Sequence, residues 1–252
     1  MMKHYLLLIS FSFIYIASAG AKELSLLQPD FAFEIGGSFN TISNFNIGAN
    51  KISNLLTWAN DRETMGFSGN TYIVANVHAK MVLRIGFEIL VPRTLKDIQG
   101  AFEGLNIING KTITYSMIPT VGWDMFYYTS KRFRAFIGGE LGYAMLRSVN
   151  EWHYSDDAKG VGFLDFTERL SASTVSINPY AGLEYALVDR YSIIFKLGYR
   201  VLKYRTITAD NGYTNGVDVT SEKNATVLNY DGTNRRYDFS GVNVAMSFRV
   251  YF

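Results

Sequence analysis

The chain has no cysteine among its 252 residues and only four prolines. The lack of cysteine excludes disulfide scaffolds, thiolate metal sites and a lipid anchor on cysteine. An excess of one charge is also missing, because 24 Lys and Arg against 22 Asp and Glu give +2, which is too balanced for nucleic-acid binding. The chain is instead rich in Tyr (17), Phe (18) and Gly (22), which favours extended strands with apolar faces.

The first residues predict an export signal. Lys3 precedes an apolar run, residues 5–17, which is too short to span a bilayer. Residues 17–19 (Ala, Ser, Ala) supply the small side chains that a signal peptidase needs. We expect residues 1–21 to be cleaved and residues 22–252 to form one exported domain. No later apolar run is long enough for a spanning helix, so that domain is either soluble or a membrane-spanning barrel.

Beyond Gln28 the chain alternates apolar with polar or small residues, which is the period of a β-strand. No helical period of comparable length competes with this pattern. Eight segments carry it, at residues 31–41, 70–79, 81–91, 112–127, 133–145, 174–187, 191–204 and 237–252.

The joins between these segments differ in length in a regular way. Tight turns lie at residues 79–81, 128–132 and 188–190, and long polar joins lie at residues 42–69, 92–111, 146–173 and 205–236. Long joins at one end and short turns at the other are typical of outer-membrane barrels, with short periplasmic turns and long extracellular loops. We therefore expect an all-β fold, an eight-stranded antiparallel up-and-down transmembrane β-barrel.

The two faces of the segments favour a membrane barrel over a soluble one of lipocalin type, whose apolar face would point inward. One face is large, apolar and free of charge, as in Ile85, Phe87 and Ile89. Aromatic residues gather toward the strand ends, for example Tyr127 near a turn and Tyr143 toward a long join. Such clustering is typical of the aromatic girdles at the two membrane interfaces.

The opposite face carries charged residues of both signs. Five acids and five bases share it: Glu34, Arg84, Glu88, Asp124, Arg134, Glu140, Glu184, Lys196, Arg200 and Arg249. The interior of an eight-stranded barrel is only wide enough for side chains, and an unpaired buried charge costs several kcal/mol. The equal numbers therefore predict a salt-bridged plug, and the alternative is an ion path or a catalytic carboxylate pair.

Basic residues gather where the expected strands leave the outer interface. They are Arg93, Lys96, Lys111, Arg147, Lys203, Arg205, Arg235 and Arg236. Phosphorylated glycolipid, such as lipopolysaccharide, is a matching counter-charge for such a rim. A rim of solvated side chains is the alternative.

The long joins carry whatever specificity the chain has. The third is acidic, with Glu151, Asp156, Asp157, Asp165 and Glu168. It also holds His153, but the spacing of His153 from its neighbours matches no nucleophile motif, and no metal-ligand spacing is present. We expect no enzyme, no cofactor and no metal.

Two prolines fall within expected strands. Pro119 and Pro179 lack the N–H that a strand donates to its neighbour, and a closed barrel leaves no strand as a free edge. We therefore expect bulges or loosened pairing at both positions.

The C-terminal segment, residues 242–252, has an apolar residue at every second position, including Phe248 and Val250, and ends in Tyr251 and Phe252. With this terminus the mature chain resembles the small eight-stranded outer-membrane barrels of the OmpA-transmembrane, OmpX and OmpW type. In that family such a terminus is the signal that the outer-membrane insertion machinery reads. The resemblance implies a monomer in the bacterial outer membrane, surrounded by its lipid, with loops at the cell surface.

Together these features predict a non-enzymatic outer-membrane protein with a plugged interior. It would act through its four long loops as a surface-exposed structural or interaction protein. The alternative that OmpW-like proteins suggest is a minor porin or a conduit for small or hydrophobic molecules.

Overall fold

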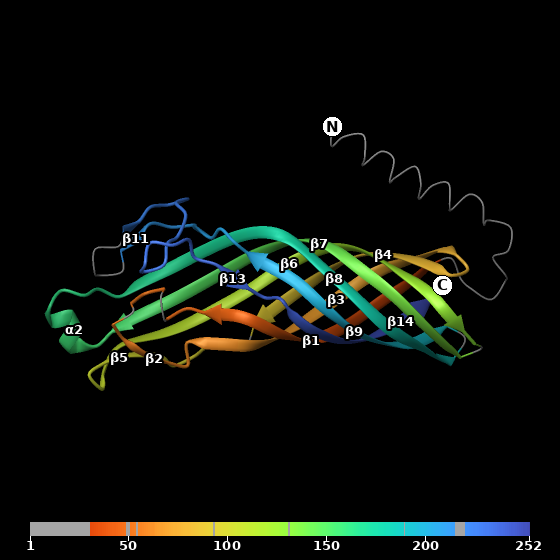
Figure 1. The fold of residues 1–252 in the computed structure, drawn as a ribbon, viewed down its shortest axis with the longest axis horizontal. Helices are drawn as coiled ribbons and strands as arrows, with labels where there is room; N and C mark the ends of the chain where they lie inside the picture. Colours follow the sequence, from red (N-terminus) through yellow and green to blue (C-terminus); the bar gives the residue numbers. More distant parts are fainter. Residues whose placement is uncertain are drawn as a thin grey trace.

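The structure, a computed structural model, describes residues 31–48, 51–53, 55–92, 94–130, 132–188, 190–214 and 220–252. The expected signal segment, residues 1–21, lies outside these ranges. Eight long strands follow one another around a closed antiparallel ring (Figure 1): β1 (Phe31–Asn46), β3 (Arg62–His78), β4 (Met81–Pro92), β6 (Leu105–Thr129), β7 (Phe133–Tyr154), β8 (Phe166–Val188), β9 (Tyr191–Tyr204) and β14 (Gly241–Tyr251).

Each strand pairs with the next in sequence, and β14 pairs back with β1, where Glu34 lies opposite Arg249 and Phe39 opposite Val244. The expected all-β fold of eight antiparallel strands in sequence order is confirmed. Among the described residues, no helix is long and apolar enough to cross a membrane.

The smaller elements gather at the end of the ring opposite the C-terminus, which we call the loop end (Figure 1). They are β2 (Thr57–Ala59), β5 (Ile98–Phe102), α2 (Asp156–Gly160), β10 (Thr208–Ala209), β11 (Tyr213–Thr214), β12 (Thr220–Ser221) and β13 (Tyr237–Asp238). The tight joins lie at the other end, the turn end.

Much of the expected long joins is strand, which corrects their sequence-based bounds. Strands β6 and β7 stay paired as far as Ile108 opposite Tyr154, and β8 begins at Phe166. The physical reason is that the strand period continues there: Ile108, Trp152 and Phe166 turn their side chains into the ring and are buried. Polar residues on the other side of these extensions made them look like loops.

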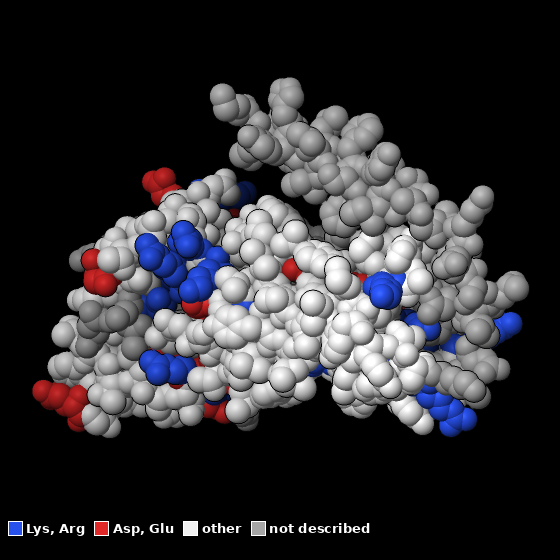
Figure 2. Space-filling model, turned by 45° about the vertical axis from the view of Figure 1, so that its right-hand side comes forward, with Lys and Arg blue, Asp and Glu red and all other residues white. Residues whose placement is uncertain are grey.

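The outward face of the ring is a belt of exposed apolar side chains. Ile85 is 65% exposed, Leu197 60% and Met246 58%. Figure 2 shows this surface as a largely white area, with Lys and Arg gathered mostly toward its two ends. So large an exposed apolar surface is not typical of a protein that is surrounded by water.

Pairing is loosened at both strand prolines, as expected. Between β6 and β7 the pairs run from Met117 opposite Met145 directly to Thr120 opposite Gly142, and Pro119 is passed over. Between β8 and β9 they pass over Pro179 in the same way. The skipped pairs are those that would need the missing proline N–H, while the pairing of each proline with its other neighbouring strand is intact.

The interior is filled in layers. Toward the turn end lies a small cluster of apolar and aromatic residues, including Val82, Phe126 and Phe136. Charged residues occupy the middle. Toward the loop end lies a larger apolar core that includes Phe45 and Trp152. This core was not expected from the sequence, which predicted salt bridges as the filling.

Candidate functional site

The middle of the interior is organised around one carboxylate. Glu34, on β1, lies 2.6 Å from the Lys196 ammonium, 2.7 Å from the Arg249 guanidinium and 3.4 Å from that of Arg84. Strand alternation turns all four side chains inward, and each residue is at least 94% buried. One carboxylate therefore faces three cations, and these cations need further partners.

The other acids of the interior supply those partners. Arg84 lies 2.8 Å from Glu140 and 3.5 Å from Asp124. Arg249 lies 3.5 Å from Asp124 and 3.4 Å from Glu184. Ion pairs therefore connect these side chains into one network across the ring. Tyr180 adds a hydroxyl that donates to Asp124 at 2.7 Å and contacts Arg84.

Glycine makes room for this network. A Cβ at Gly122 would lie 2.9 Å from the side chain of Glu140 and 3.3 Å from that of Arg84. A Cβ at Gly138 would lie 2.8 Å from a carboxylate oxygen of Asp124. The chain therefore places glycine where long charged side chains from neighbouring strands cross.

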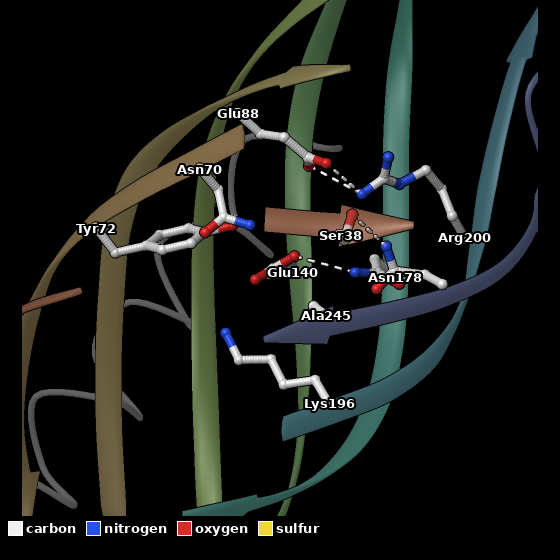
Figure 3. A pocket seen from close by; sticks show the side chains of 10 residues that line it. Ser38, Asn70, Tyr72, Glu88, Glu140, Asn178, Lys196, Arg200 and Ala245 are labelled. Carbon is white, nitrogen blue, oxygen red and sulfur yellow. Dashed lines mark hydrogen bonds and ion pairs between the residues drawn. The ribbon is translucent and has the colours of Figure 1, made fainter. Parts of the chain in front are cut away.

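A second pair lies beside the network. One nitrogen of Arg200, Nη2, donates to both carboxylate oxygens of Glu88, at 2.7 and 2.9 Å. Among the described residues, the remaining nitrogens of Arg200 and the amide oxygens of Asn70 and Asn178 have no hydrogen-bond partner. Figure 3 shows these side chains around a common space with Tyr72 and Lys196. That space is about 10 Å³, close to the minimum for one water molecule, which could satisfy several of these atoms.

The ten charged residues that the sequence assigned to the interior have the following positions. Nine are buried, and Arg134 is half-buried at the turn end, 3.7 Å from Glu184. Each has an ion-pair partner of opposite charge among the ten. All the carboxylates face cations, and the space beside them has room for about one water. The arrangement therefore suits a structural network better than substrate binding.

One residue of the expected basic rim was misplaced. Arg235 is 2% exposed, and its Nη1 donates to both oxygens of Glu168 at 3.1 Å. Glu168, expected in an acidic loop, is 1% exposed and also accepts from Asn150 at 2.9 Å. If the alternation of the expected strand 174–187 is extended back to residue 168, it predicts that Glu168 faces inward. No pattern in the sequence predicts that Arg235 is buried.

The rest of the rim is at the surface, except Arg93, which lies outside the described residues. The exposed members are Lys96, Lys111, Arg147, Lys203, Arg205 and Arg236. Two of them already have counter-charges on the protein, because Arg147 contacts Asp210 and Lys203 lies 3.1 Å from Asp238.

The expected assembly signal divides between two faces. Phe248 is 38% and Phe252 70% exposed, and Val250 is half-buried on the same outward face. Tyr251 points inward, where it is 8% exposed and its hydroxyl donates to Glu184. Tyr251 is therefore also part of the charged interior.

His153 lies in a small surface cluster at the loop end. Its Nδ1 lies 3.1 Å from Asp165, which also accepts from Lys159 at 3.0 Å and from the backbone N–H of Tyr154 at 2.8 Å. Burial acts to raise the pKa of Asp165, but these hydrogen bonds outweigh it and lower the pKa to about 2. Among the described residues, no three His, Cys, Asp or Glu side chains are grouped so that they could hold a metal ion.

Several solved structures are similar to this chain. Neisserial surface protein A has 10% identity and a TM-score of 0.45, with 88% of this chain and 97% of that chain covered. Ail, the attachment invasion locus protein of Yersinia pestis, has 12% identity and a TM-score of 0.44, with 88% and 99% covered. The outer membrane protease OmpT from Escherichia coli has 9% identity and a TM-score of 0.44, with 92% and 99% covered.

These three similar structures are all outer-membrane β-barrels. Neither a protein-family model nor a curated protein sequence matches the chain.

Proposed function

We propose that the chain is an integral outer-membrane β-barrel protein with a closed interior, which acts at the cell surface through its loop end. The observation that carries the proposal is that the apolar side chains of the ring face outward and its charged side chains face inward. Exposed apolar side chains form the outward belt, while nine of the ten charged residues that the sequence assigned to the interior are buried inside. Lipid is the solvent that stabilises such a belt. Because the ring has no free strand edge, the backbone N–H and C=O groups of its strands can pair with neighbouring strands within the lipid.

The packing of the interior supports a closed barrel over a pore. The charged network crosses the middle, and the space beside Glu88 and Arg200 has a volume of about 10 Å³. Above it the apolar core fills the loop end with rings such as Trp152, which is 1% exposed. A solute on the axis would have to displace both layers.

The loop end supports an interaction role. Exposed apolar side chains lie on its turns: Leu105 is 68% exposed, Val161 76% and Leu164 71%. Basic residues such as Lys111 and Arg205 are exposed below them, where they could bind the phosphates of outer-membrane glycolipid. We further propose that residues 1–21 are an export signal and that the C-terminal strand guides insertion.

Two measurements test this proposal. On a gel, unboiled protein from outer-membrane fractions should migrate faster than boiled protein, as expected of a closed barrel that resists detergent. In planar bilayers the purified protein should give no conductance steps, with a porin reconstituted in parallel as the positive control. Recovery in the soluble fraction would overturn the membrane assignment, whereas regular conductance steps would favour the conduit alternative.

A further inference from the structure

The three tight turns at the turn end share one feature. In each of them a basic residue directly precedes the returning strand: Lys80 before β4, Arg132 before β7 and Arg190 before β9. Lys131 is a fourth base in these turns. None of the four belongs to the charged interior or to the basic rim of the loop end.

The backbone holds the three preceding residues at equivalent positions. The carbonyl oxygen of each one accepts a hydrogen bond from the backbone N–H of a residue near the end of the neighbouring strand. The pairs are Lys80 with Phe126, Arg132 with Ala186 and Arg190 with Tyr251, each at 2.8 Å. The three bases therefore sit at the last hydrogen bond of the ring, on three different strand pairs.

Their side chains are exposed, and no carboxylate of the described residues lies within ion-pair distance of any of them. Asp124 and Glu184, each two residues from one of these backbone contacts, are buried and pair with Arg249. Asp30 and Asp189 lie outside the described residues. Figure 2, in which the turn end comes forward, shows Lys and Arg side chains there. These bases are therefore available to a counter-charge from outside the protein.

Aromatic rings indicate the depth of the bases in a bilayer. Phe133 directly follows Arg132, and Tyr191 directly follows Arg190 and stacks on Phe248 with a distance of 5.7 Å between ring centroids. Rings at the end of an apolar belt lie at the level of the lipid headgroups. Because one strand residue advances the chain by only ~3.4 Å, the basic side chains can reach the phosphates at that level.

We propose that the turn end binds the phosphates of anionic glycerophospholipids, such as phosphatidylglycerol, through Lys80, Arg132 and Arg190. A guanidinium donates two parallel N–H groups to a phosphate, and a lipid with a net negative charge is attracted by all three bases. The inference goes beyond the proposed function, which concerns the loop end, and rests on it only for the membrane setting. The leaflet concerned is the one opposite the basic rim.

Urea unfolding in vesicles of phosphatidylcholine, with and without phosphatidylglycerol, tests this inference. At low salt, phosphatidylglycerol should raise the folding equilibrium constant of the unchanged protein. In the double variant Arg132→Gln and Arg190→Gln this gain should be smaller by roughly fivefold per base removed. Adding Lys80→Gln should reduce the gain further.

The double variant Lys159→Gln and Lys223→Gln is the matched control. It removes two bases that are exposed at the loop end and do not belong to the basic rim, and it should keep the full gain. The rim itself is unchanged in every turn-end variant, so its own contribution to the gain cancels in the comparison.

Two further readouts separate charge from fold. The double variant Arg132→Lys and Arg190→Lys keeps both charges and should retain most of the gain. High salt should remove the gain from the unchanged protein, because salt screens exposed charges. A purely structural role of the two arginines would predict neither result.

Three outcomes would overturn the proposal: phosphatidylglycerol gives the unchanged protein no gain, the turn-end variant keeps the full gain, or the loop-end control loses as much as the turn-end variant. The first outcome would show that the bases have counter-charges elsewhere in the chain. Protein that folds in vesicles of phosphatidylcholine alone, and migrates faster unboiled on a gel, would still support the closed membrane barrel. Failure of this inference is therefore distinguishable from failure of the proposed function.

Discussion

At the scale of single residues, the buried charges do not contribute equally. Glu34 contacts three cations, whereas Glu140 contacts Arg84 and accepts from Asn178 at 3.1 Å. Removing one member of a buried ion pair leaves the other charge without compensation, and this cost exceeds what the intact pair contributes. The contacts therefore rank the acids by the number of cations that each one neutralises.

This ranking gives a prediction for Glu34. Glu34→Gln should destabilise the protein by about 3–5 kcal/mol, because Lys196 and Arg249 lose a charged partner at short distance. Glu140→Gln should cost less, since Arg84 keeps Glu34 and Asp124 nearby. Urea unfolding in lipid vesicles, followed by tryptophan fluorescence, measures both.

Leu141→Ala, on the outward face beside Glu140, is the matched control for these variants and should have a smaller effect than Glu34→Gln. Equal effects of Glu34→Gln and Leu141→Ala would contradict the network described for the interior.

At the scale of elements, the alternating pattern located the strands well in the apolar belt and poorly beyond it. The strand expected at residues 133–145 continues to Tyr154 in the structure. Arg235, expected in the basic rim, is buried in the interior. The alternation of apolar and polar residues indicates whether a residue faces inward or outward. It does not indicate where along the strand the lipid ends and the water begins. Polar outward residues past that point look like loop residues, so the sequence understated β6, β7 and β8.

The prolines give a prediction for one element. Pro119→Val restores an N–H to β6 at the position where pairing with β7 is interrupted. Valine also favours strands, so the variant should be more stable by about 1 kcal/mol, the net value of one hydrogen bond. The same unfolding measurement tests it, and Thr71→Val, an outward substitution that adds no N–H, is the control. A variant no more stable than this control would show that the gap has another cause.

At the scale of the whole molecule, a charged layer in the middle of the ring and an apolar core toward the loop end follow one another along the axis. The inward parity of the ten charged residues could be read from the sequence, because each lies opposite an uncharged outward face. The apolar core above them could be read only in part: Ile108 and Trp152 continue the inward parity of β6 and β7, but other members come from segments such as 42–47 and 227–239, which have no regular period. Their contacts depend on how the chain returns over the loop end.

The two layers should be separable by substitution. Phe45 is fully buried, with its ring centroid 5.0 Å from that of Tyr237 and 5.3 Å from that of Phe239. Phe45→Ala should therefore cost about 3–5 kcal/mol, as for other buried phenylalanines. Phe39→Ala, on the outward face of the same strand, should cost clearly less. Because the charged layer closes the ring independently of the apolar core, Phe45→Ala should still give no conductance steps in planar bilayers. Steps in that variant alone would show that the apolar core, and not the buried charges, closes the barrel.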